Sequence, residues 1–235
     1  MENLKIKYFL INCIVFIMVC PVYVYPGIVI EQVERSTNFE GMINTVLFFS
    51  GNNMRMDDLE NKTSTVSLFG EDTGYFISHK KKFYFRYKLS EKAKEEMKNT
   101  GQNQEKPAED SSSVIKNKKI EVIKTSEKKV VNGFNVAKIN IMVDNELVEE
   151  DWVTNDMDMT EVKNIIEKMK KLYSTQAGNE EDEIAKALEK HGFSILSKRY
   201  STFLNNEKVE DVIEVIKVEK KALSNNLFGP PFFKF

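Results

Sequence analysis

The stretch that decides the fold is NVAKINIMVDNELVEEDWV, residues 135–153. Apolar and polar side chains alternate on both sides of the Asp144-Asn145 pair, and alternation with a period of two is typical of strands that bury one face. Asp and Asn both tolerate the backbone conformations of a tight turn. These residues therefore predict a β-hairpin, with strands at Asn135–Val143 and Glu146–Val153.

The same alternation recurs on both sides of this hairpin, separated by short polar turns such as Ser50-Gly51-Asn52-Asn53. Because these turns are short, successive strands are expected to run antiparallel. The further strands that we expect are Ile28–Val33, Met42–Phe49, Met54–Asp57, Thr63–Phe69, Tyr75–His79, Phe83–Lys88, Val114–Lys124, Lys128–Val131, Phe193–Phe203 and Val209–Lys221.

Two helices are expected between the last strands. Thr160–Tyr173 carries apolar residues at steps of three and four, with lysines and glutamates on the other face. Glu180–Lys190 follows Asn179, a good N-cap, and ends before Gly192. The order of strands, helices and strands predicts an α+β fold, in which helices lie on one face of an antiparallel sheet.

A polar insertion at about residues 89–113 divides the strands into two groups. Leu89–Asn99 is helix-prone but has little apolar surface, and Thr100–Ser113 contains Pro107 and few apolar side chains. A segment of this composition cannot bury enough surface to offset its ordering entropy. We therefore expect a mobile loop at Thr100–Ser113.

Residues 1–26 are expected to be a signal peptide. Lys5 and Lys7 precede the apolar run Tyr8–Cys20, a pattern typical of a secretory signal, and the run is short for a membrane span, which needs roughly 20 apolar residues. The chain is therefore predicted to be exported to the periplasm or cell envelope. An uncleaved anchor and a lipoprotein anchored through Cys20 are alternatives, although Val19 stands where the lipoprotein signal has a small residue.

Composition excludes several classes of function. The net charge of −2 gives no overall field that would attract nucleic acid, and both cysteines, Cys13 and Cys20, lie in the expected signal. The two histidines, His79 and His191, have no second ligand at metal-binding spacing. No serine stands in a catalytic motif. We expect no catalytic residues, no metal and no cofactor.

The run KKKFYFRYK, residues 80–88, interleaves basic and aromatic side chains. Our main interpretation is a solvated turn at Lys80–Lys82 that leads into a core strand, with Phe83, Phe85 and Tyr87 on one face. A contact with anionic lipid at a membrane surface is the alternative. Nucleic acid is not expected, because an exported protein rarely meets it.

Four segments resemble an uncharacterised exported bacterial family of the LolA-like (lipoprotein-carrier) superfamily. They are the opening strands up to Met54-Arg55-Met56-Asp57, the strand-turn-strand Tyr75–Tyr87, the pair Val130–Lys138 and Glu150–Thr154, and the ending Lys221–Pro231. The resemblance implies one domain over residues 27–235, a curved antiparallel β half-barrel with helices covering the concave face. The insertion at 89–113 departs from the family pattern at one rim.

The resemblance also implies a cavity between sheet and helices, which holds acyl chains in carrier relatives. Methionine suits contacts with varied apolar ligands, although Met in strands and helices is more often core. The expected cavity-lining residues are Phe48, Met54, Met56, Phe76, Trp152, Ile165, Met169 and Leu172.

The leading hypothesis is a non-enzymatic exported envelope protein that binds a hydrophobic or acylated ligand, such as a lipid or a lipoprotein acyl chain. The alternative is a structural or sensory envelope module that acts through contacts with a protein partner and whose core is filled by its own side chains.

Overall fold

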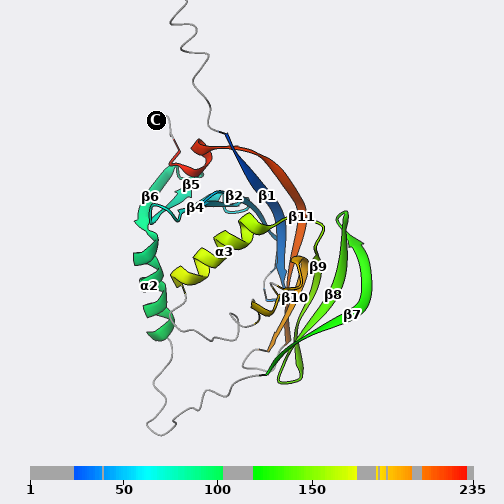
Figure 1. Ribbon diagram of the computed structural model, residues 1–235. Helices are drawn as coiled ribbons and strands as arrows, with labels where there is room; N and C mark the ends of the chain where they lie inside the picture. Colours follow the sequence, from blue (N-terminus) through cyan, green and yellow to red (C-terminus); the bar gives the residue numbers. More distant parts are fainter. Residues whose placement is uncertain are drawn as a thin grey trace, which may run out of the picture.

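The computed structural model describes residues 24–38, 40–102, 119–173, 184, 186–188, 190–202 and 208–231. Over this part of the chain, eleven strands form one open antiparallel sheet (Figure 1). The strands are β1 (Val24–Ser36), β2 (Ile43–Ser50), β3 (Asn53–Asp58), β4 (Thr63–Leu68), β5 (Thr73–Ser78), β6 (Phe83–Lys88), β7 (Ile120–Val131), β8 (Phe134–Val143), β9 (Glu146–Thr154), β10 (Phe193–Thr202) and β11 (Lys208–Ser224).

The spatial order is β6-β5-β4-β3-β2-β1-β11-β10-β9-β8-β7. Two series of antiparallel strands run outward from the centre of the sheet, β1 to β6 on one side and β11 to β7 on the other. The first and last strands, β1 and β11, pair at the centre and join the two series. β1 and β11 pair from Val24 with Ser224 to Ser36 with Asp211. The antiparallel sheet expected from the sequence is therefore confirmed, and its edges are β6 and β7.

Helix α3 (Thr160–Tyr173) packs on one face of this sheet. Val162 and Ile165 are buried in one cluster with Ile28 and Ile30 of β1 and Phe49 of β2. Figure 1 shows the sheet bending around α3, so this face is concave. Helix α2 (Leu89–Gln102) continues directly from β6 and stands beside that edge of the sheet.

The opposite face carries its own apolar cluster, which explains why the end of the chain folds back. Val29, Val66 and Ile77 pack there with Leu223 and Phe228. Phe228 belongs to the 3-10 helix η1 (Asn225–Phe228), and the N-cap Ser224 accepts a hydrogen bond from the backbone of Asn226. The C-terminal turn thus covers the convex side of β1–β5.

Several expectations need correction. Thr100–Gln102 are helical and extend α2, whereas a loop was expected there; the rest of the expected loop, 103–113, lies outside the described residues. The separate strands expected at Val114–Lys124 and Lys128–Val131 are one strand, β7, with an irregularity between Lys124 and Lys128. Of the helix expected at Glu180–Lys190, the structure describes 184 and 186–188 as helical.

The interpretation of Phe83–Lys88 as a core strand is wrong. β6 is an edge strand, and Phe83, Tyr84 and Phe85 are exposed by 40%, 44% and 51%. An edge strand has a neighbour on one side only, so its side chains lose half of the cross-strand cover that a central strand enjoys.

Val24, Tyr25 and Pro26, assigned to the signal peptide from the sequence, pair with β11 in this chain. Signal cleavage before Val24 would preserve these pairs. No helix among the described residues has the length and apolar character needed to cross a bilayer.

Candidate functional site

The concave face continues as an apolar surface beyond the part that α3 covers. Cross-strand pairing places one row of side chains on this face from β1 to β6, because paired residues in a sheet point to the same side. The row is Ile30, Leu47, Met56, Thr65, Phe76 and Phe85.

Burial falls along this row toward the sheet edge. Ile30 is 2% exposed, Met56 is 38% exposed and Phe85 is 51% exposed. The end near α3 is therefore closed core, whereas the end near β6 is an open apolar surface. Half-exposed methionine and phenylalanine in a continuous row can accept an apolar ligand without first being unpacked.

Ring packing arranges the open end. Phe76 stacks on Phe85 with ring centroids 5.3 Å apart, and Phe83 lies 6.4 Å from Phe76. Met54, on the next row of the same face, packs against the α3 cluster. We call Met54, Met56, Phe76, Phe83 and Phe85 the concave floor.

The next row on the same face is Met54, Ser67, Gly74 and Tyr87, and its small residues leave little side-chain bulk above the sheet. Gly74 pairs with Tyr87, and a Cβ at position 74 would lie 2.3 Å from the Tyr87 ring. The ring therefore lies flat over the glycine, as aromatic side chains do where an edge glycine needs cover. Lys92 of α2 in turn places its Nζ 4.9 Å from the centre of the Tyr87 ring. Because that ring lies against the sheet, the floor beside it stays uncovered.

A groove of about 320 Å³ lies at the end of α3. Its apolar lining is Phe69 and Leu172, and its polar lining is Asn52, Lys168 and Lys171. The Nζ of Lys168 hydrogen-bonds Oδ1 of Asn52, and Glu161 accepts a 2.5 Å hydrogen bond from the backbone of Gly51. These two contacts tie α3 to the β2–β3 turn, so the groove has one fixed wall.

The predicted site residues fall into three groups. Met54, Met56 and Phe76 lie on the concave floor; Met169 and Leu172 are half-buried on α3, where Leu172 lines the groove. Ile165 is fully buried in closed core. Phe48 does not join these residues, and Trp152 is buried in the same core cluster as Ile165.

Phe48 packs on the convex face, where it joins the cluster around Val29 and Val66. The reason is strand alternation: Phe49 and Leu47 point toward α3, so Phe48 between them points away. Phe48 therefore does not lie on the concave face where it was expected, and we leave it out of the proposed site.

Trp152 lies on β9, in the other half of the sheet. The Nζ of Lys129 sits 3.8 Å from the centre of the indole ring and that of Lys138 sits 5.8 Å away. Lys138 also pairs with Glu150, which raises the pKa of Lys138 through a hydrogen bond from the ammonium to the carboxylate. Trp152 is 8% exposed, so the ring belongs to closed core with lysines over it rather than to the open apolar surface, and it too is left out of the proposed site.

The structure brings together one pair that sequence reasoning missed. The Oγ of Ser64 lies 2.7 Å from Nε2 of His79, the arrangement of an activated nucleophile and its base. Ser64 is 1% exposed, however, and Arg55 donates a 3.1 Å hydrogen bond to the same oxygen. A substrate carbonyl therefore has no approach to this hydroxyl.

The contacts of Arg55 show that the Ser64–His79 pair belongs to a structural polar network. Its Nε lies 2.6 Å from Oδ1 of Asp57, and its Nη1 donates a 2.9 Å hydrogen bond to the carbonyl of Leu227. Arg55 thus links β3 and β4 to the C-terminal turn. The sequence carried a signal for this network. Arg55 stands between Met54 and Met56 in a predicted strand, and an arginine in such a position is a candidate for a buried polar network.

A second polar group lies under the helical residues 184 and 186–188. Glu149 and Asp151 are 3% and 1% exposed, and they accept hydrogen bonds from Ser197 and Ser194. Burial, and then the charge of Glu149, raise the pKa of Asp151 to about 7. In the described part of the chain no three His, Cys, Asp or Glu side chains come together as a metal site would require.

A family model described as a domain of unknown function, DUF4412, matches residues 30–232. The chain belongs to this family. The matched range contains the concave floor, the groove and both polar groups of the DUF4412 domain. No curated protein matches the sequence.

Several solved structures are similar to this DUF4412 protein. One of PNGF-II has a TM-score of 0.35 and 15% identity, and the match covers 86% of this chain but 29% of PNGF-II. A domain described as an outer membrane lipoprotein-sorting protein, from Vibrio parahaemolyticus, has a TM-score of 0.31 and 8% identity, with 87% and 89% of the two chains covered. A LolA superfamily protein from Nitrosomonas europaea has a TM-score of 0.29 and 7% identity, with 89% and 91% covered.

Proposed function

We propose that this DUF4412 protein is a non-enzymatic protein of the cell envelope that binds a hydrophobic or acylated ligand on its concave floor. The observation that carries the proposal is the row from Ile30 to Phe85, which passes from closed core to half-exposed apolar side chains on one face. Partly exposed Met and Phe offer adaptable contacts to chains of varied length.

The groove at the end of α3 supplies the polar end of such a site. An acyl ligand has an apolar tail and a carboxylate or phosphate head. Phe69 and Leu172 suit the tail, and the ammonium groups of Lys168 and Lys171 suit an anionic head. The groove volume of about 320 Å³ is within the range of small-molecule sites, roughly 300–1,000 Å³.

Met56→Asp should lower the affinity for a fluorescent fatty acid by about tenfold or more, because an apolar tail would desolvate the new carboxylate without a partner for it. The folded state should be little affected, since Met56 is 38% exposed. Fluorescence titration of the purified protein measures the affinity.

The matched control is Leu59→Asp, which changes an apolar side chain that is 52% exposed in the turn after β3. It should leave fatty-acid binding unchanged. If the wild type takes up no probe, and organic extraction of protein purified from its own envelope yields no lipid, the ligand proposal fails. The chain would then be better explained as an interaction module.

Replacing Val15 and Phe16 with Asp should retain the protein in the cytoplasm, because each charge costs roughly 2.5–3.5 kcal/mol in an inserting apolar segment. A reporter fused after residue 40 measures the location. Export of this variant at the wild-type level would contradict the signal-peptide interpretation, and with it the proposed place in the envelope.

A further inference from the structure

The tip of the β5–β6 hairpin is a cluster of positive charge. Lys80, Lys81 and Lys82 are consecutive and exposed. Lys82 adopts a φ of 52°, which belongs to the tight turn that presents the three side chains. Within the described part of the chain, none of the three has an ion-pair partner in the structure, so their charge is directed to solvent.

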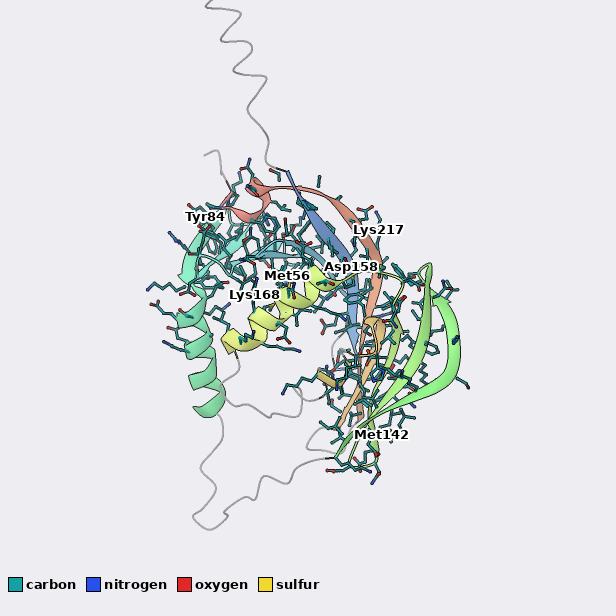
Figure 2. The ribbon with its side chains drawn as sticks, in the orientation of Figure 1. Met56, Tyr84, Met142, Asp158, Lys168 and Lys217 are labelled. Atoms are coloured by element: carbon teal, nitrogen blue, oxygen red, sulfur yellow. The ribbon has the colours of Figure 1, made fainter. Side chains whose placement is uncertain are left out.

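Aromatic side chains come directly after these lysines. Phe83 and Phe85 lie on the concave face, and Tyr84 lies on the convex face, where its ring packs edge-on to Tyr75 at 6.2 Å. All three are at least 40% exposed. Figure 2 shows Tyr84 at the outer margin of the molecule. Both faces of this edge strand are therefore apolar and open.

We propose that Lys80–Phe85, the basic aromatic edge, docks the protein onto a bilayer surface that contains anionic lipids. Charge complementarity carries the choice of partner. No Asp or Glu occurs between residues 80 and 88, and lysines near an anionic membrane attract it over about a Debye length. The phenylalanine rings then enter the apolar side of the interface, and tyrosine, an apolar ring with a polar tip, is favoured at the level of the headgroups.

Other cations of the segment are engaged within the protein. Arg86 donates a 3.0 Å hydrogen bond to Oγ1 of Thr73, and Lys88 pairs with Glu91 at 3.0 Å. The outward charge is thus concentrated at the tip, next to the rings. A soluble polyanion would use the lysines and leave three large aromatic side chains in water, whereas a bilayer uses both.

This inference goes beyond the proposed ligand site and does not require it. Phe83 and Phe85 belong to both surfaces, so they do not separate the two proposals. The lysines and Tyr84 do separate them, because Tyr84 lies on the face opposite the concave floor.

The test places an indole on the edge with Tyr84→Trp and measures quenching by vesicles of brominated phosphatidylglycerol and phosphatidylcholine. Bromine quenches only an indole that reaches the lipid, so the signal reports this edge even if another segment also binds the membrane. We expect strong quenching with anionic vesicles and little with phosphatidylcholine alone. The unsubstituted chain, whose one tryptophan is Trp152, provides the background.

Lys80→Gln, Lys81→Gln and Lys82→Asn, combined with the indole at position 84, should weaken binding by roughly 100-fold, about fivefold per lysine. Asn is chosen at position 82 because it tolerates a positive φ. The matched control replaces three exposed lysines of the opposite side, Lys124, Lys128 and Lys190, with Gln.

Quenching that persists in the hairpin variant, or falls equally in the control, would overturn the proposal. So would a change of the indole fluorescence by dextran sulfate without vesicles as large as the change with anionic vesicles, which would point to a soluble polyanion. Binding of a fluorescent fatty acid should be unchanged in the hairpin variant, so failure of either proposal can be recognised without the other.

Discussion

Raising the pH from about 5 to about 8 should destabilise the folded protein, and Asp151→Asn should remove most of the loss that comes from this residue. Asp151 and Glu149 lie two residues apart on β9 and point to the same face, where both are almost fully buried. Oδ2 of Asp151 has no hydrogen-bond partner in the described part of the structure.

The raised pKa sets the sign of this effect. Burial and the neighbouring Glu149 carboxylate raise the pKa of Asp151 from 3.8 to about 7. Between these values the folded protein holds a proton that the unfolded chain has released. Stability is therefore full below about pH 4 and decreases as pH rises to about 7, by a few kcal/mol in all.

His191 acts in the opposite direction over part of this range. Burial and the positive charges of Lys124 and Lys190 lower the pKa of His191 below 6.5, so its contribution to stability grows as pH rises through that value. The measurement is therefore the difference between wild type and Asp151→Asn. Urea unfolding at several pH values should show the variant to be more stable at pH 8 and the gap to close near pH 4.

Glu146→Gln is the control, because it neutralises an exposed carboxylate of the same strand. It should leave the pH dependence of the free energy of unfolding unchanged. If the difference in the free energy of unfolding between wild type and Asp151→Asn stays constant with pH, the raised pKa is contradicted. The substitution would then affect stability only through packing.

Glu149 and Asp151 show which part of the candidate site could be predicted from the sequence and which could not. Alternation in residues 146–153 implies that Glu149, Asp151 and Val153 share one face of a strand. It could not show that this face is buried, because an acidic strand segment normally lies in solvent. The face is covered by Ile184 and Leu188, which join Ile141 and Val143 from a segment more than thirty residues away along the printed sequence.

Phe48 was misplaced for a related reason. In Met42–Phe49 both alternating sets are apolar, so the sequence does not say which of them faces α3. The ambiguity arises because this part of the sheet is covered on both sides, by α3 and by the C-terminal turn. Hairpins were predictable because their partners are adjacent; the pairing of β1 with β11 was not, because it joins opposite ends of the domain.

The concave floor was predictable in part. Met54, Met56 and Phe76 were among the cavity-lining residues expected from the family resemblance and from the adaptability of methionine. It missed Phe83 and Phe85 as open residues, because a strand pattern does not reveal an edge position. Edge position depends on the next element of the chain, and here β6 leads directly into α2 rather than into another strand.

Ile165→Ala should cost roughly 2–5 kcal/mol of the free energy of unfolding, the usual loss for a truncated core residue. Ile165 is fully buried and packs with Ile28, Ile30 and Phe49 beneath α3. Loss of its side chain would leave a cavity at the point where the helix is fixed to the sheet. Guanidinium unfolding measures the change.

Met169→Ala, one turn further along α3, is the informative partner of this substitution. Met169 is half-buried, so its truncation should cost about 1 kcal/mol, well below the core value. If the ligand occupies the concave floor and the groove, Met169→Ala should alter fatty-acid uptake while the protein stays folded, whereas Ile165→Ala should act mainly on stability. A full core penalty at Met169 as well, with no uptake by the wild type, would show that side chains also fill the space at the groove end of the helix. The ligand-binding proposal would then be wrong, and a module that acts through protein contacts would remain.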